Sequence, residues 1–269
     1  MTTTRGLRDR EQPITMLTAY HALTARLVDA AGIDIVLVGD SMGTTVLGYD
    51  DTLPVTLDEA ASHTAAVVRG TDDALVVADM PFLSVGVDDS ETVRNAGRML
   101  KEAGADAVKL ESGPHTVELT DRLTQLGIPV MAHLGLTPQH VNQLGGYTRQ
   151  GTTTEAAEEI LSLAHDHEEA GAFSLVLEHV PANVAAEITD ALEIPTIGIG
   201  AGPDCDGQVL VSSDVMGLSE DQPPFAEQFG DVAAAMTDAI DSYREAVETG
   251  EFPAAEHSHI EESVDDFTE

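Results

Sequence analysis

The sequence predicts an α/β protein built as a single-domain (β/α)8 barrel of the TIM type. Its 269 residues, 42% of them hydrophobic, fit the roughly 250 residues typical of one such barrel. Short apolar segments alternate along the chain with segments of helical periodicity. The apolar segments are nearly continuous, which is typical of parallel strands that are buried on both faces.

Eight segments have the composition of strands: residues 14–20, 34–41, 74–82, 106–113, 129–136, 174–180, 195–202 and 208–214. Eight strands alternating with helices favour a closed barrel, and an open doubly wound sheet is the alternative. The stretch 201–207 is too short for a regular helical crossover, so we expect an irregular link between the last two strands.

Several helix boundaries carry a chemical signal of their own. Thr56 and Glu59 have the spacing of a capping box, in which each side chain satisfies a backbone N–H of the other residue. Glycines that suit helix ends stand at positions 32, 104, 127 and 171. These signals divide the chain in agreement with the alternating pattern.

We expect the barrel domain to span residues 1–250 and an acidic tail to follow it at 251–269. The tail contains seven acidic residues and neither lysine nor arginine. Such a run is typical of a mobile, solvated terminus.

The chain carries 48 acidic and 12 basic residues, a net charge of −36. This charge repels nucleic acids and anionic membranes, so we expect neither as a partner. The acids are spread along the whole chain, which favours a halophilic surface adapted to high intracellular salt. An acidic interaction tail and ordinary compositional drift are the alternatives.

The sequence also bears on location and on sulfur chemistry. No apolar run approaches the roughly 20 residues of a membrane span, and the first residues are polar, without a signal-peptide pattern. We therefore expect a cytoplasmic protein. Cys205 is the single cysteine, which excludes an intramolecular disulfide and a cysteine-based zinc cluster.

Polar residues stand repeatedly at the ends of the predicted strands. Catalytic groups of a barrel come from the C-terminal strand ends, which meet at one face. The residues in these positions are Asp40 and Ser41, Asp79, Lys109 and Glu111, His133 and Glu178. Their recurrence at one end is the strongest sign of a functional site in the sequence.

Asp40 and Asp79 end consecutive strands, so their carboxylates are expected to lie close together. Two close carboxylates either share a proton or bind a cation, and hard oxygen ligands suit Mg²⁺. The alternative is that each aspartate only caps the loop that follows it.

Lys109 and Glu111 are two residues apart and therefore face the same side of their strand. A lysine within an apolar run is costly unless it is paired. A buried structural ion pair is one interpretation. The functional one is an ammonium that binds a substrate carboxylate while Glu111 supports the metal. A Schiff-base lysine is a third possibility.

His133 and Glu178 have both structural and functional interpretations. His133 is either a hydrogen-bonded structural residue or a contact to a ligand. A partly desolvated Glu178 would have a raised pKa, which suits a general base near neutral pH.

The segments VGDSMG, VKLESG, HLGLTPQHVNQLGGYTRQG, LEHVP and PTIGIGAGPDCDGQVLV resemble the ketopantoate hydroxymethyltransferase family, in family order. The resemblance extends from residue 14 to residue 258. Two features depart from it: the segment 222–229 lacks the usual basic residues, and the acidic C-terminal extension is unusual. Because of the first departure, the resemblance does not determine the details of the folate-binding face or of the subunit packing.

The resemblance implies a reaction, its cofactors and an assembly. A one-carbon unit passes from 5,10-methylenetetrahydrofolate to 3-methyl-2-oxobutanoate, which gives 2-dehydropantoate on the route to pantothenate and coenzyme A. The reaction passes through an enolate that Mg²⁺ stabilises, and a methanopterin-type carrier is the alternative donor. A homo-oligomer, of the decameric ring type, is also implied.

The family motif assigns roles to residues of this chain. The implied metal ligands are Asp40 and Asp79, with Glu111 in support, and the implied catalytic residue is Glu178, the proton acceptor at C3. The implied substrate-binding set is Asp40, Ser41, Asp79, Lys109 and His133.

Two other functions remain as alternatives. A metal-dependent keto-acid barrel of the phosphonopyruvate or isocitrate lyase type would stabilise an enolate without folate. Its nucleophilic cysteine loop is missing, because Cys205 stands in a different setting. A non-catalytic acidic scaffold is the second alternative, and it predicts no dependence on metal.

Overall fold

The computed structural model describes residues 2–219 and 221–261 of the chain. Eight parallel strands close into a barrel in chain order, which confirms the predicted fold and excludes the open sheet. The strands are β1 (Ile14–Thr18), β2 (Ile35–Val38), β3 (Leu75–Asp79), β4 (Ala107–Glu111), β5 (Val130–Gly135), β6 (Ser174–Glu178), β7 (Thr196–Ile199) and β8 (Gly207–Leu210).

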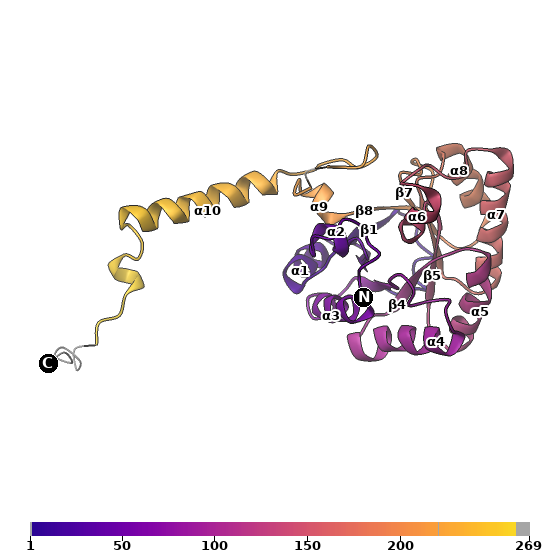
Figure 1. Cartoon of the computed structure of the whole chain (residues 1–269), viewed down its shortest axis with the longest axis horizontal. Helices are drawn as coiled ribbons and strands as arrows, with labels where there is room; N and C mark the ends of the chain where they lie inside the picture. The colour runs from indigo at the N-terminus through magenta and orange to yellow at the C-terminus, as the bar shows by residue number, and fades with distance from the viewer. Residues whose placement is uncertain (1, 220, 262–269) are drawn as a thin grey trace. The chain divides into compact units, whose positions relative to one another are not determined.

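Helices surround the strands on the outside of the barrel (Figure 1). Those before β5 are α1 (Ala22–Ala30), α2 (Met42–Thr45), α3 (Leu57–Val68), α4 (Asp89–Arg98), the π-helical turn η1 (Met99–Ala103), the 3-10 turn η2 (Pro114–Thr116) and α5 (Val117–Gln125). Those after β5 are the 3-10 turn η3 (Pro138–His140), α6 (Val141–Leu144), α7 (Thr154–Glu169) and α8 (Ala182–Ala191). The chain then continues with α9 (Ser212–Val215), α10 (Val232–Thr249) and the 3-10 turn η4 (Ala255–His257).

Local signals in the sequence account for the helix ends. The Thr56 hydroxyl accepts a hydrogen bond from Glu59 N at 3.2 Å, and Glu59 Oε2 accepts one from Thr56 N at 2.8 Å. This is the predicted capping box, now at the start of α3. Gly104 ends η1 with φ +86°, a left-handed conformation that glycine adopts without steric cost.

The hydrophobic core has an inner and an outer part. Inside the barrel, one cluster joins inward-facing residues of the strands, among them Met16, Leu37, Val77 and Val176, and it also includes Leu7 of the N-terminal segment. Two further clusters lie between the strands and the covering helices. The inner cluster fills the barrel below the polar strand ends, as expected for a packed core rather than a pore.

The link between β7 and β8 contains no helix, as the short spacing predicted. Gly200 and Gly202 in this link both have positive φ, +61° and +85°. The carboxylate of Asp206 accepts a hydrogen bond from Thr196 N at 2.8 Å, which fastens the end of the link to the start of β7.

The chain separates into two compact units. The barrel unit comprises the residues up to Ser212 together with Pro223–Ala226, and the second unit comprises Ser213–Gln222 and the residues from Glu227 onward. Within the second unit, α10 has no buried residue. Residues 262–269 of the acidic tail lie outside the described residues, and the division at residue 250 stays a prediction. None of the helices in the described ranges is long and apolar enough to cross a membrane.

Candidate active site

The register of the barrel brings the polar strand ends together. Asp79 of β3 pairs with Lys109 of β4, and Glu111 of β4 pairs with His133 of β5. One step further round the barrel, Glu178 ends β6. Because these strands are parallel, their C-terminal ends lie at one mouth of the barrel, where Asp40 stands two residues after the end of β2.

Lys109 forms an ion pair inside this cluster. Its Nζ lies 2.9 Å from Asp79 Oδ2, and both side chains are buried. Burial opposes the ammonium charge, but the neighbouring carboxylates, Asp79 first, outweigh it and raise the pKa of Lys109 above its ordinary value. The lysine is therefore a permanent cation, which argues against the Schiff-base interpretation.

Asp40 is the carboxylic acid most strongly affected by its surroundings. Burial and the charges of Asp79 and Glu111 raise the pKa of Asp40 well above its ordinary value, and Lys109 only partly opposes them. Its backbone N–H donates to Asp79 Oδ2 at 3.3 Å, so the two aspartates are neighbours, as predicted. Three carboxylates thus share one buried ammonium.

The loop that follows β5 holds the carboxylate of Glu111. The backbone N–H of Gln139 lies 3.1 Å from both carboxylate oxygens of Glu111. His140 Nδ1 lies 3.5 Å from Glu111 Oε2, and this contact raises the pKa of His140. Glu111 is thereby fixed in orientation before any ligand binds.

Lys109 also sets the tautomer of His133. Lys109 Nζ lies 3.3 Å from His133 Nδ1, and because an ammonium can only donate, Nδ1 must accept. Burial, followed by the charge of Lys109, lowers the pKa of His133 to about 4, so the ring is neutral near pH 7. Its proton therefore sits on Nε2, which lies 3.2 Å from Glu178 Oε2.

Glu178 is a largely buried carboxyl group at the end of β6. Burial raises the pKa of its carboxyl to about 7, and Lys109 opposes this shift only in part. The strand ends at this residue because His179 turns sharply, with φ +50°. His179 N donates to Ile199 O at 2.8 Å, which holds the turn against the end of β7. The turn leaves the Glu178 side chain at the mouth of the barrel.

The Ser41 hydroxyl contacts Tyr20 rather than the ionisable residues of the cluster. Its hydroxyl lies 2.9 Å from the hydroxyl of Tyr20, which is buried. Ser41 also precedes the short helix α2 without capping it through its side chain. Its place next to Asp40 keeps it at the barrel mouth, and its contact to substrate stays a prediction.

The donor set fits a hard divalent cation. Asp79 Oδ1 is buried and has no hydrogen-bond partner among the described residues, so an acceptor oxygen is left unsatisfied beside Asp40. Within residues 2–219 and 221–261, no three His, Cys, Asp or Glu side chains converge closely enough to hold an ion by themselves. Mg²⁺ commonly binds one or two carboxylates and completes its shell with water and substrate oxygens. The pair Asp40 and Asp79 matches that requirement.

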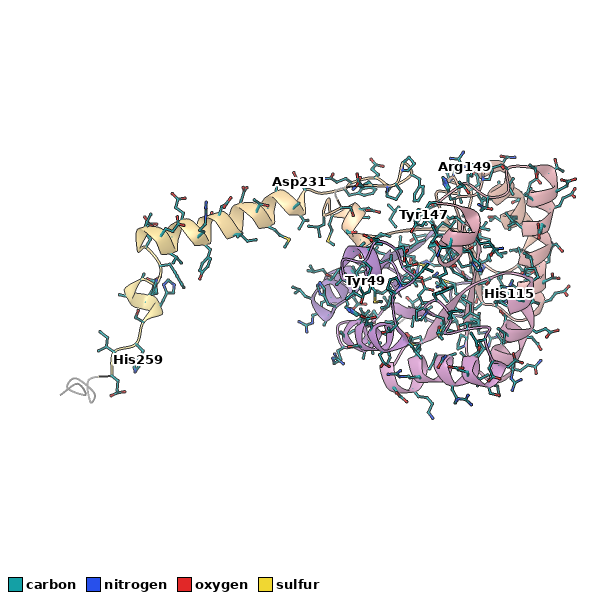
Figure 2. The ribbon with its side chains drawn as sticks, in the orientation of Figure 1. Tyr49, His115, Tyr147, Arg149, Asp231 and His259 are labelled. Atoms are coloured by element: carbon teal, nitrogen blue, oxygen red, sulfur yellow. The ribbon has the colours of Figure 1, made fainter. Side chains whose placement is uncertain are left out.

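Sequence reasoning missed two residues near the mouth. Gln139 links Asp40 to Glu111, and its place in the loop after β5 gave no sign of this because the contact depends on the path of the loop. Tyr147, on the glycine-flanked segment after α6, is half-exposed (Figure 2). Partial burial and the charges of Asp51 and Asp40 raise its pKa.

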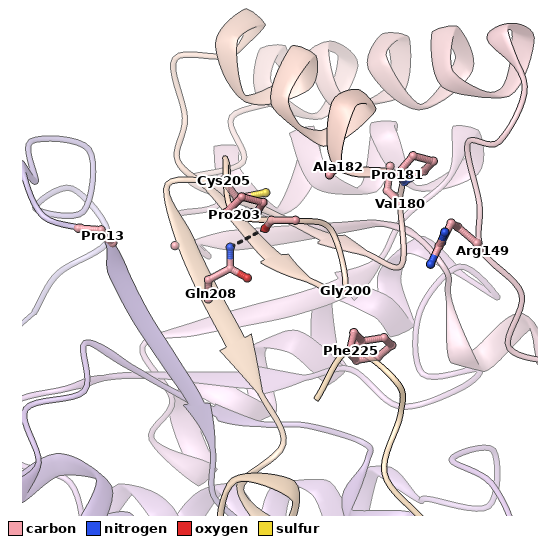
Figure 3. Close-up of a pocket in the computed structure, with 12 residues that line it drawn as sticks. Pro13, Arg149, Val180, Pro181, Ala182, Gly200, Pro203, Cys205, Gln208 and Phe225 are labelled. Atoms are coloured by element: carbon pink, nitrogen blue, oxygen red, sulfur yellow. Dashed lines mark hydrogen bonds between the residues drawn. The ribbon is translucent and has the colours of Figure 1, made fainter. Parts of the chain in front are cut away.

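A cavity lies outside this cluster of ionisable residues. It has a volume of about 760 Å³, lies along the link between β7 and β8, and contains none of the predicted site residues. Figure 3 shows Gln208 and Cys205 at one end of it and Arg149 and Phe225 at the other. Arg149 is the one charged residue in its lining, so this cavity offers a single cation and no acid–base pair.

A closed barrel with buried ionisable groups at its C-terminal strand ends is the arrangement of (β/α)8-barrel enzymes. The solved structure of phosphoenolpyruvate phosphomutase from Streptomyces platensis subsp. rosaceus resembles the chain with a TM-score of 0.62 at 15% identity, over 91% of this chain and 86% of that one. A phosphonopyruvate hydrolase in complex with oxalate and Mg²⁺ has a TM-score of 0.62 at 14% identity, over 96% and 93%. At these identities the likeness concerns the fold alone.

The sequence comparisons are more specific. Residues 1–255 match the family described as ketopantoate hydroxymethyltransferase. The 3-methyl-2-oxobutanoate hydroxymethyltransferase of Haloarcula marismortui is 71% identical over 256 residues, which is 95% of each chain. That of Trichlorobacter lovleyi is 51% identical over 253 residues, 94% of this chain and 95% of the other. The chain belongs to the ketopantoate hydroxymethyltransferase family, as the sequence motifs predicted.

Proposed function

We propose that this protein transfers a hydroxymethyl group from 5,10-methylenetetrahydrofolate to 3-methyl-2-oxobutanoate and so forms 2-dehydropantoate for pantothenate and coenzyme A synthesis. One observation carries the proposal: a single barrel mouth combines a carboxylate pair, a permanent cation and a carboxyl group whose pKa is about 7. These are the groups needed to bind a 2-keto acid and remove a proton next to its carbonyl.

The substrate is an anion and needs a positive partner. Lys109 is buried at the mouth and stays charged, so it supplies the ammonium for the substrate carboxylate. Ser41 and His133 complete the substrate contacts, with the His133 Nε2 proton as a neutral donor. Asp40 and Asp79 would contact the substrate indirectly, because the cation that they would hold binds it.

Asp40 and Asp79 would hold Mg²⁺, with Glu111 in support. When bound, Mg²⁺ draws electron density from the keto oxygen and so favours the enolate. The unsatisfied Asp79 Oδ1 supports this assignment, because a buried carboxylate oxygen without a partner is costly.

Glu178 accepts the proton from C3 of the substrate. The electron pair of the broken C–H bond moves toward the keto carbon and gives the enolate. Water adds to the methylene carbon of the donor, both bonds from this carbon to the carrier nitrogens break, and the two water protons pass to these nitrogens, which leaves the one-carbon unit as formaldehyde. C3 of the enolate then forms a bond to the formaldehyde carbon, and the resulting alkoxide takes the proton from Glu178 and becomes the hydroxyl group. Near pH 7 about half of the Glu178 side chains are ionised and able to act as base.

The test is product formation from 3-methyl-2-oxobutanoate with 5,10-methylenetetrahydrofolate, with and without Mg²⁺. We expect Asp79→Ala to abolish Mg²⁺-dependent formation of 2-dehydropantoate while the circular dichroism spectrum stays unchanged. Full activity in that variant would remove Asp79 from the metal site. A parallel assay with a methylene-tetrahydromethanopterin donor decides which carrier the enzyme accepts.

The remaining expectations concern the whole protein. We propose a cytoplasmic homo-oligomer, of the decameric type, and sedimentation velocity measures its size directly. A monomer at micromolar concentration would reject the oligomer and leave the reaction proposal intact.

A further inference from the structure

Gln139 contacts two of the three acidic residues of the proposed cation site, Asp40 and Glu111. It lies in η3, the turn after β5, and its backbone N–H faces both oxygens of Glu111 at 3.1 Å. Its side-chain Nε2 donates to Asp40 Oδ2 at 2.9 Å and to the carbonyl oxygen of Met80 at 3.0 Å. One residue thus joins the ends of β2, β3 and β4.

The partners of the amide determine its orientation. The carbonyl oxygen of Met80 can only accept a hydrogen bond, so the NH₂ group and not the oxygen of Gln139 must face Met80 and Asp40. The two protons of this NH₂ group match the two acceptors. The amide is therefore held in one position, and Asp40 Oδ2 is occupied by a fixed donor.

This contact has a consequence for Asp40. The carboxylates of Asp79 and Glu111 repel it, and the charge of Lys109 opposes them only in part. A donor on Oδ2 holds the group in place against this repulsion and leaves its other oxygen for a ligand. Hydrogen-bond partners of ligating carboxylates typically change metal affinity by 10–100-fold when they are removed.

We infer that Gln139 is a positioning residue of the cation site, which orients Asp40 through its side chain and Glu111 through its backbone before the cation binds. The inference rests on the proposed function, because it takes Asp40 and Asp79 as the ligands. It assigns a role to a residue that touches neither the reacting carbon nor the keto group.

Two variants distinguish the contribution of the Gln139 side chain from that of its backbone N–H. Gln139→Met keeps the length of the side chain and Gln139→Ala leaves room for water, and both keep the backbone N–H on Glu111. Gln143 is the matched control, since it lies in α6 four residues further along the same loop and is exposed. Isothermal titration calorimetry of folded protein with MgCl₂, and with MnCl₂ as a second probe, measures affinity without substrate.

We expect the dissociation constant for Mg²⁺ to rise about 10–100-fold in Gln139→Met and Gln139→Ala. In Gln143→Met it should equal that of the wild type. If both Gln139 variants bind Mg²⁺ as tightly as the wild type, while Asp79→Ala does not bind it, Gln139 is only a structural link and the inference is wrong. If the wild type itself binds no Mg²⁺, the proposed cation site fails and this inference fails with it.

A melting experiment without metal completes the test. A purely structural link would lower Tm in the Gln139 variants and leave the Mg²⁺ dissociation constant of the folded protein unchanged. A positioning role changes the dissociation constant whether or not Tm falls. Because the two quantities are measured separately, a loss of stability alone does not count as support.

Discussion

Glu178 and His133 lie within 3.2 Å of each other, yet burial affects their protonation in opposite directions. It raises the pKa of the carboxyl group to about 7 and lowers that of the imidazole to about 4. In both cases the neutral form is favoured, because charge is poorly solvated at this position. Of the two groups, only the Glu178 carboxyl changes its protonation near pH 7, which supports the role of base that we propose for it.

The raised pKa of Glu178 has a cost for stability that can be measured. Its pKa is about 7 in the folded protein against 4.5 for the ordinary group, so the wild type loses stability as pH rises between these values. Glutamine does not titrate. We therefore expect the Tm difference between Glu178→Gln and wild type to grow by a few degrees in favour of the variant from pH 5 to pH 8. A difference that is constant with pH would contradict the raised pKa.

Lys109 stabilises the carboxylates around it. Its removal leaves Asp40, Asp79 and Glu111 buried without a cation, and breaking a buried ion pair typically costs about 3–5 kcal/mol. We expect Lys109→Met to lose about this much in urea-induced unfolding. Lys101→Met is the control, since Lys101 is the only other lysine and is exposed. Equal stability of the two variants would contradict the argument.

At the scale of the element, the end of β5 has to lie close to the end of β6. Gly135 has φ +97°, and a Cβ atom there would lie 2.3 Å from the carbonyl oxygen of Glu178. We expect Gly135→Ala to displace Glu178 and to lower kcat at least tenfold. The loss of stability should exceed about 2 kcal/mol, the upper end of the cost of a left-handed backbone conformation alone.

Gly127 supplies the comparison for that variant. It has φ +84° and no atom within 4 Å of the added Cβ. Gly127→Ala should therefore lose only the stability that backbone strain costs, about 1 kcal/mol. Its kcat should equal that of the wild type. Equal behaviour of Gly135→Ala and Gly127→Ala would show that the close approach of β5 and β6 is unimportant.

The elements were largely predictable because their signals are local. Eight apolar runs, a capping box at Thr56 and the short spacing before β8 all lie within a few residues of the feature they predict. Strand ends were predicted too long, as β2 stops at Val38 rather than at residue 41. Asp40 and Ser41 therefore lie beyond the end of β2, whereas Asp79, Glu111 and Glu178 are the last residues of their strands.

The candidate site was predictable as a set of residues but not as a network. Strand order and parity placed Asp79, Lys109 and Glu111 at one mouth. The tautomer of His133 and the bridge from Gln139 depend on distances between side chains of different elements. Those distances follow from barrel closure and loop path, which no short stretch of sequence encodes.

At the scale of the whole molecule, the net charge of −36 is the dominant electrostatic feature. The barrel core and the ion pair of Lys109 with Asp79 use few of the 48 acidic residues, so most of them repel one another on the surface. At 1 M salt the Debye length falls to about 3 Å, which screens this repulsion.

We therefore expect the Tm to rise continuously from 0.1 M into the molar range of KCl, by about ten degrees or more. This rise corresponds to screening of charge repulsion on the order of several kcal/mol. Differential scanning calorimetry at a fixed pH measures it. A matched series in sucrose controls for excluded-volume effects, which stabilise without screening. A Tm that is flat in KCl would reject the halophilic interpretation of the acidic surface.

We propose that Glu178 removes the C3 proton of the keto acid, and solvent-deuterium exchange measures this step apart from the one-carbon transfer. Wild-type protein with Mg²⁺ should place deuterium at C3 of 3-methyl-2-oxobutanoate in D₂O without any one-carbon donor, as followed by proton NMR. Glu178→Gln should bind the keto acid yet lose exchange by at least a factor of about 10²–10⁴. Exchange at the wild-type rate in Glu178→Gln would show that another group removes the proton.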